Sequence, residues 1–252
     1  PEGECSQGTP HSTSSSAPQR IVIEEQGPMK VTLRIEGRHH SSSGGVSRGL
    51  YGYRVFITAY AGKPYLDVQY ALTNTYVEGD MPKNARKALD GGAQPYTAYS
   101  WPFLEYSLDF ELNLSNDQRF TLLGQKEHSG ILGNESARLF QGKGSFSITE
   151  HNVHISEGID AKGAALISDG NFGMMLAMRD FAPNCPKAIT VSNNQLKMEL
   201  FPKTDQVYWL DPHSNKNHRM RLEFFKGTPR DGMLTKMWKR KDAPLRAIAP
   251  VE

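Results

Sequence analysis

The feature that most constrains this chain is a strict alternation of apolar and polar residues. In residues 104–112, apolar side chains occupy every even position and polar side chains every odd one. The same period of two recurs in 31–36 and 66–73. Because successive side chains of an extended strand point to opposite faces, these segments predict strands with one face buried and one in water. Such strands are typical of antiparallel sheets.

Further extended segments follow along the chain, separated by turn signals such as Ser-Asp-Gly-Asn at 168–171. They are 52–60, 118–123, 145–155, 163–168, 172–179, 187–192, 196–201 and 219–226. Segment 172–179 is apolar on both faces, which predicts a central strand covered on both sides, with Leu176 fully buried. Only 231–240 has a helical pattern. The pattern therefore predicts an all-β, two-layer antiparallel sandwich with little helix.

The domain organisation follows from shifts in composition. Residues 1–19 are rich in Ser, Gly and Pro and predict a linker or long loop. Residues 20–228 predict the β-sandwich domain, and 229–252 predict a short helix and a linker towards a further domain. The chain opens at Pro1 with no apolar leader, so we expect a fragment of a longer, multidomain protein whose targeting signal lies elsewhere.

Charge and hydropathy exclude several classes of partner. The 252 residues carry a formal net charge of +2, too small for a field that would draw the chain onto nucleic acid. The longest strongly apolar run is far shorter than the roughly 20 residues that span a membrane. Two cysteines, Cys5 and Cys185, are too few for a disulfide framework or a four-cysteine zinc site, and whether they pair stays open.

Catalytic and metal motifs are absent from the sequence. There is no HExxH, nucleophile elbow, phosphate loop or dinucleotide fingerprint, so we expect neither metal nor cofactor. The histidines at 39, 40, 151 and 154 are interpreted as exposed polar residues. Three-residue spacing on a strand would place His151 and His154 on opposite faces.

Three acidic residues share one face of the strand predicted at 104–112. Glu105, Asp109 and Glu111 lie at successive or near-successive positions, where neighbours on a face are about 7 Å apart. That separation is compatible with the paired carboxylates of a glycosidase. Alternating acids are equally ordinary on the wet face of a sheet.

Two long loops interrupt the strands, at 39–45 and 76–102. The second contains Tyr96, Tyr99 and Trp101. Flat amphipathic rings suit the apolar face of a sugar, so these residues predict either a substrate-binding loop or a lid on the sandwich edge.

Charged residues gather in two other places. Arg179 and Asp180 follow the apolar segment 172–178, where a charge needs an ion pair or a ligand. Segment 211–219 contains Lys216, His218 and Arg219.

Several short motifs together carry a resemblance to a known family. They are 23–28, 33–37, 54–65, 177–181, 186–188, 196–202, 216–218 and 244–250. In this respect the chain resembles the central β-sandwich of the exo-rhamnogalacturonan-lyase-like polysaccharide lyases. The resemblance implies a galactose-mutarotase-like supersandwich placed between a small barrel and an α/α toroid. It also implies a polysaccharide or oligosaccharide partner, further domains of the same chain, and an extracellular or periplasmic location.

Two principal functions follow. The first is part of the substrate cleft of a polysaccharide lyase acting on a uronate- or rhamnose-containing glycan, in which case the isolated fragment is inactive. Elimination needs a cation beside the carboxylate and a base, so the candidates are Arg179, Lys187, Lys216, His218 and Arg219. No catalytic role is assigned among them. The alternative is a non-catalytic glycan-binding or spacer module. A mutarotase-like epimerase would need a His base with a facing carboxylate, and no such paired motif is visible.

Overall fold

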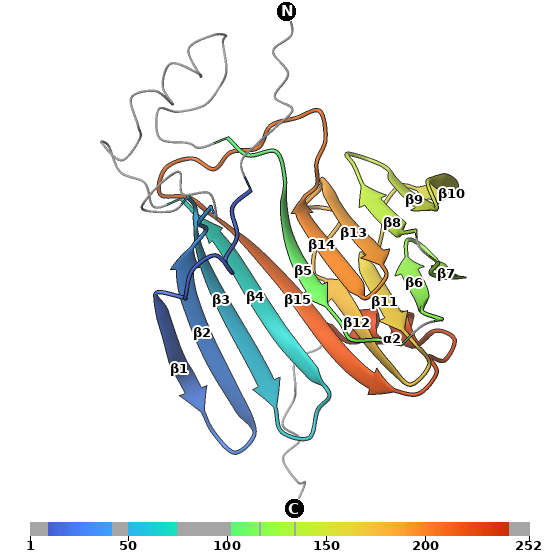
Figure 1. Cartoon of the computed structure of the whole chain (residues 1–252), viewed down its shortest axis with the longest axis horizontal. Coiled ribbons are helices and arrows are strands. Elements are labelled where there is room, and N and C mark those ends of the chain that lie inside the picture. Colours follow the sequence, from blue (N-terminus) through green and yellow to red (C-terminus); the bar gives the residue numbers. More distant parts are fainter. Residues whose placement is uncertain (1–9, 42–49, 75–101, 116, 134, 242–252) are drawn as a thin grey trace, which may run out of the picture. The chain divides into compact units, whose positions relative to one another are not determined.

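The computed structural model of the chain describes residues 10–41, 50–74, 102–115, 117–133 and 135–241 (Figure 1). These residues form strands β1 (Arg20–Gln26), β2 (Lys30–Arg38), β3 (Gly52–Tyr60), β4 (Tyr65–Thr73), β5 (Tyr106–Glu111), β6 (Arg119–Leu123), β7 (Glu127–Ile131), β8 (Ala137–Gln141), β9 (Phe146–Glu150), β10 (Val153–Gly158), β11 (Ala164–Ser168), β12 (Phe172–Met178), β13 (Lys187–Ser192), β14 (Gln195–Phe201) and β15 (Asn215–Lys226), with helix α2 (Met233–Arg240). No helix in the described ranges combines the length and apolarity needed to cross a membrane.

The strands make two antiparallel sheets. One sheet has nine strands in the order β1-β2-β3-β4-β15-β12-β11-β6-β7, and the other has six in the order β10-β9-β8-β13-β14-β5. The prediction of an all-β fold with two antiparallel sheets and little helix is confirmed. The chain divides into two compact units, one of Pro1–Leu108 with Glu199–Arg219 and one of Asp109–Met198 with Met220–Glu252.

The first unit contains the meander β1–β4. Its registers place apolar residues of neighbouring strands directly opposite one another, as in the row Ile21, Ile35, Val55 and Tyr70. The β3–β4 turn uses Gly62 at φ 67°, a left-handed conformation that glycine adopts without strain. The alternation seen in the sequence thus becomes one apolar face and one polar face.

The second unit has β12 between β15 and β11, and residues 173–178 are buried on both faces. Leu176 is 0% exposed, so the prediction of a doubly covered central strand is confirmed. Helix α2 lies within the predicted helical segment 231–240. Its residues Leu234 and Met237 join a core cluster whose other buried members are Leu123, Ala164, Leu166, Met175 and Ala177.

Hydrogen bonds to residues far away in the sequence hold both ends of α2. The carboxylate of Glu127 on β7 accepts hydrogen bonds from the backbone N–H and hydroxyl of Thr235, at 2.8 and 2.7 Å. It also accepts the N–H of Gly232 at 3.2 Å. Near the other end, Trp238 Nε1 donates to the Lys162 carbonyl at 2.6 Å. The first helical turn lacks acidic residues of its own, so Glu127 supplies the charge that its N-terminus favours.

One predicted strand is wrong. Segment 145–155 is a hairpin of β9 and β10, and not a single strand. His151 and Asn152 form its turn with φ of 53° and 61°, a pair of left-handed residues that suits a tight hairpin. Strands β1, β7 and β8 were not predicted. The sequence of β7, Glu-His-Ser-Gly-Ile, has little alternation.

Candidate functional site

The candidate residues from the sequence fall into three groups. Tyr96, Tyr99 and Trp101 lie outside the described residues. Arg179 and Lys187 belong to the second unit, whereas Lys216, His218 and Arg219 belong to the first. No group of three His, Cys, Asp or Glu residues suited to a metal ion occurs in the described part of the chain.

In the second unit, Arg179 and Lys187 lie in very different surroundings. The side chain of Arg179 is 46% exposed just after β12, and its Nε lies 3.7 Å from the Asp180 carboxylate. Lys187 begins β13, is 1% exposed, and donates from Nζ to the Pro186 carbonyl at 3.1 Å. Arg179 is therefore accessible to a large ligand, and Lys187 is not.

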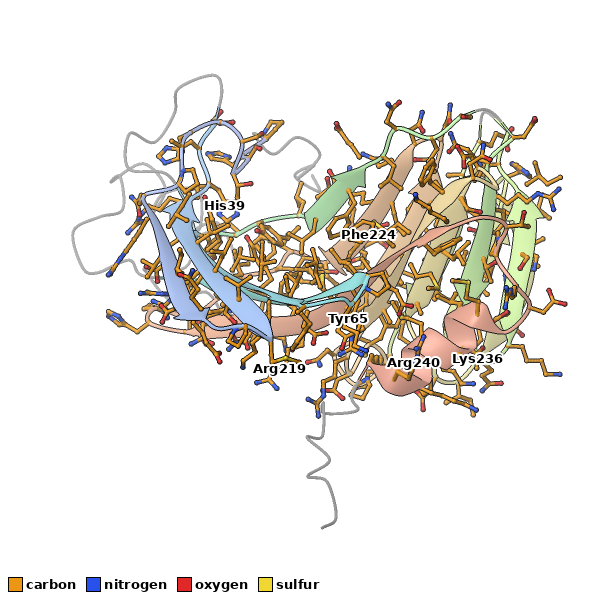
Figure 2. All side chains as sticks on the ribbon, turned by 90° about the horizontal axis from the view of Figure 1, so that it is seen from below. His39, Tyr65, Arg219, Phe224, Lys236 and Arg240 are labelled. Carbon is orange, nitrogen blue, oxygen red and sulfur yellow. The ribbon has the colours of Figure 1, made fainter. Side chains whose placement is uncertain are left out.

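In the first unit, three candidates lie on β15. Lys216 and His218 share the inner face, with Lys216 half-buried and His218 buried. Arg219 is exposed on the opposite face (Figure 2). The structure therefore places Lys216 and His218 together and directs Arg219 away from them.

His218 adjoins a cluster of aromatic rings. Phe201 meets the His218 ring edge-to-face at 6.0 Å. Phe201 also packs on Phe103 and Tyr208, and its ring centroid lies 5.2 Å from the ring centroid of each. The Tyr208 hydroxyl donates to the Pro202 carbonyl at 2.7 Å, which satisfies its polar atom within the apolar surroundings.

A second buried histidine, His39, directly follows β2 (Figure 2). It belongs to a hydrogen-bond network that the sequence analysis missed. It was interpreted as an exposed residue of a loop, and that interpretation is wrong because the side chain is 5% exposed. Its Nδ1 lies 2.6 Å from the Tyr51 carbonyl, which can only accept, so Nδ1 carries the proton. Nε2 therefore accepts from the Tyr106 hydroxyl at 2.7 Å, and Tyr70 lies 3.3 Å from it. The Tyr70 and Tyr106 hydroxyls are also hydrogen-bonded to each other.

Burial keeps this network uncharged. It lowers the pKa of His39 to about 4, because the imidazolium would lose its hydration. Burial likewise raises the pKa of Tyr70 and of Tyr106 above the ordinary value of a phenol. At neutral pH the three groups are thus neutral and linked by hydrogen bonds, an arrangement that fixes side chains in position.

A signal for His39 was present in the sequence. It continues the odd-numbered apolar positions of β2 that include Leu33 and Ile35, so it faces the same side. Gly37 lies in the same row, and a Cβ there would meet the Tyr53 hydroxyl at 2.5 Å. The glycine therefore makes room for an aromatic ring beside His39.

The connections β2–β3, β4–β5 and β14–β15 have described residues at the same end of these strands, where β2 ends, β3 begins and β4 ends. We call this the loop end, defined by its described residues 39–41, 50–51, 74, 102–103 and 208–216. Asn74 donates from its N–H to the Ser214 carbonyl at 2.9 Å and from its side chain to the Leu210 carbonyl at 2.8 Å. Phe103 and Tyr208 exchange two backbone hydrogen bonds of 2.8 Å. Asn74, directly before 75–101, and Phe103, two residues after it, are thus hydrogen-bonded to the segment that leads into Lys216.

The loop end can offer one lysine to a ligand, and an amide follows it on β15. Lys216 is half-buried; Asn217 is exposed on the opposite face of the strand, and its amide donates to Asn215 at 2.6 Å. An ammonium of this kind attracts a carboxylate as a point charge, and amides match hydroxyl groups.

Comparisons with known proteins give similarity in fold only. No family model matches the chain, and no curated protein matches it. Among solved structures, a candidate aldose 1-epimerase from Escherichia coli K12 has 15% identity and a TM-score of 0.40, over 82% of this chain and 68% of that one. A galactose mutarotase-like protein from Lactobacillus casei has 13% identity and a TM-score of 0.38, over 81% of this chain and 73% of that one. A GH36 α-galactosidase from Geobacillus stearothermophilus has 10% identity and a TM-score of 0.45, over 84% of this chain but only 26% of the galactosidase.

Proposed function

We propose that this chain is a carbohydrate-active β-sandwich module that contacts its glycan at the loop end of the first unit. In a longer protein, it would form part of the substrate cleft of a polysaccharide lyase acting on a uronate- or rhamnose-containing glycan. The motifs that resemble the exo-rhamnogalacturonan-lyase-like family support the assignment of the module; those at 33–37 and 54–65 lie on β2, β3, the turn that follows β3 and the first residue of β4.

One observation carries the choice of site. The hydrogen bonds of Asn74 and Phe103 tie both flanks of residues 75–101 to the segment 208–214. Trp101 is two residues before Phe103 in the sequence, and Phe103 is hydrogen-bonded to Tyr208, seven residues before the start of β15. Flat rings for the apolar face of a sugar, together with a cation for a uronate, make a suitable acidic-glycan contact.

A non-catalytic glycan-binding module is the second candidate, and the burial of two residues favours it. Lys187, Lys216 and His218 are the candidates that could serve as a base; Lys187 and His218 are each 1% exposed, and Lys216 is half-buried. A general base must come within hydrogen-bond reach of the proton it removes. For Lys187 or His218 to act on a polymer, the surrounding structure would have to open.

A binding experiment tests the site. The 252-residue chain should bind an oligosaccharide of galacturonate and rhamnose more tightly than a neutral oligosaccharide of the same length. Lys216→Ala and Trp101→Ala should each weaken this binding by roughly tenfold, the loss of one ion pair or one stacking contact. Lys236→Ala on the exposed face of α2 removes the same charge and should bind normally. Equal binding by the wild type and both site variants would disprove the site.

A second experiment separates the two functions. Elimination produces an unsaturated sugar that absorbs in the ultraviolet. The isolated chain should give no such product, because a single cleft wall neither positions the substrate nor excludes water. The full-length protein should produce it if the module belongs to a lyase, and should bind without producing it if the module only binds.

A further inference from the structure

Strand β1 is the outer strand of its sheet and exposes apolar side chains. It occupies one end of the nine-strand order and pairs with β2 (Figure 1). Ile21 is 63% exposed and Ile23 is 56% exposed. An edge strand of this composition is a template for pairing with another strand, which proteins usually block.

The sequence of β1 complements itself when two copies run antiparallel. The segment Arg20-Ile21-Val22-Ile23-Glu24 has opposite charges at its ends and β-branched apolar residues between them. With Val22 opposite Val22 of a second copy, each Arg20 faces a Glu24 and each Ile21 faces an Ile23. A register centred on Ile23 would instead place Val22 opposite Glu24, which pairs an apolar side chain with a charge.

Charges on the polar face point to the same register. An ion-pair ladder runs across three strands from Glu24 through Arg34 and Glu36 to Arg54. The ladder alternates in sign and ends on β1 with an acidic group. Arg20 makes no ion pair with any residue in the described part of the chain. In the Val22-centred register, Arg20 of the second copy would extend the ladder by one more basic residue.

We propose that β1 is a homodimer interface at which two copies of this chain pair antiparallel about Val22. The two-fold axis stands perpendicular to the sheet, so the interface is isologous. Each apolar face then continues into its counterpart, and Ile21 and Ile23 gain apolar neighbours there. A β-bulge between Ile23 and Glu25 shifts the register of β1, whose pairing with β2 resumes at Glu25, so we confine the contact to Arg20–Glu24.

Charge reversal tests the register. Sedimentation of the 252-residue chain over a concentration series should show a dimer of the 28.1 kDa protomer. Arg20→Glu should raise the dimer dissociation constant by roughly tenfold or more, because it places like charges opposite each other twice. Adding Glu24→Gln to Arg20→Glu should recover most of that loss by removing the repulsion. Arg54→Glu, the same charge change on β3, should leave the dimer intact.

A cysteine experiment tests the geometry. Directly opposed residues of antiparallel strands have Cα atoms about 4.5–5.5 Å apart, within the range that a disulfide spans. In a Cys5→Ser/Cys185→Ser background, Val22→Cys should form a disulfide-linked dimer under mild oxidation. Lys63→Cys, on the exposed β3–β4 turn, should not.

Three results would contradict the proposed dimer. A chain that remains monomeric over the whole series would overturn the proposal. So would a dimer indifferent to Arg20→Glu, or cross-linking at Lys63→Cys as fast as at Val22→Cys. None of these measurements involves a glycan, so they stand or fall independently of the proposed function.

Discussion

The surroundings of β12 in the second unit and those of β2 in the first unit are buried with different chemistry. In the second unit, the buried residues of β11, β12 and α2 are almost all aliphatic, and Met175, Leu176 and Ala177 are each 0% exposed. In the first unit, the interior beside β2 and β3 contains His39 hydrogen-bonded to Tyr70 and Tyr106. Apolar burial stabilises in proportion to area and is indifferent to pH, whereas a buried polar network stabilises only while every member keeps its partner and its protonation state.

The largest loss of stability should come from placing a charge in the apolar surroundings of β12. Leu176→Asp buries an unpaired carboxylate in the middle of β12 and should lower the free energy of unfolding by on the order of 5 kcal/mol. Chemical denaturation followed by circular dichroism measures this. Leu176→Met, a change of nearly equal volume, should cost only about 1 kcal/mol. A soluble, stably folded Leu176→Asp variant would contradict the central position of β12.

The next largest loss of stability should appear at low pH and should come from His39 in the first unit. In the unfolded chain His39 titrates near 6.5, and in the folded chain its pKa is about 4. Between these values the unfolded state binds more protons, so stability falls as the pH falls. The loss should reach about 3 kcal/mol between pH 7 and pH 4.

Denaturant titrations at several pH values measure this loss, and His39→Phe provides the control because it removes the titrating group. The variant should have lower stability at pH 7 but a shallower decline towards pH 4. If both proteins decline in parallel, His39 is not the group responsible.

A smaller effect should follow from loosening α2 in the second unit. Glu127→Ala removes the acceptor for Thr235 and Gly232 and the negative charge at the helix N-terminus, at a cost of about 1–2 kcal/mol. Faster hydrogen exchange at these two amides would reveal it. Glu127→Gln retains an acceptor oxygen and should lose less. Unchanged exchange in Glu127→Ala would show that the helix is held by Leu234 and Met237 alone.

The smallest effect on stability should come from Arg179. Its ion pair with Asp180 is exposed and 3.7 Å long, so Arg179→Ala should change the free energy of unfolding by less than about 0.5 kcal/mol. Chemical denaturation of the variant and the wild type measures this change. A loss of more than about 1 kcal/mol would contradict the weak contribution expected of an exposed ion pair.

Some elements were predictable because their signal is local. The alternation within β2 and β4 and the two-sided apolar run of β12 identified these strands, since each pattern lies within a single segment. The hairpin at His151 and Asn152 was missed because its turn contains neither glycine nor proline, although both residues adopt the left-handed conformation. Strand β7 was missed because an edge strand needs little apolar alternation.

The candidate site was predictable in part. The sequence identified Lys216 and His218 as neighbours, and their shared face on β15 follows from their spacing. It did not reveal that His218 is buried or that His39 is a core residue. Exposure depends on what packs over a strand, and those residues lie far away in the sequence.

By itself, the sequence determined the all-β class, the positions of most strands and the segment that contains α2. Hydrophobic periodicity encodes these features residue by residue. Tertiary structure alone decided that His39 is neutral and that Glu127 caps a helix. These contacts join groups 67 and 108 residues apart, to Tyr106 and Thr235 respectively. Such hydrogen bonds form only after the strands have paired, because pairing supplies both the partner and the exclusion of water that shifts a pKa.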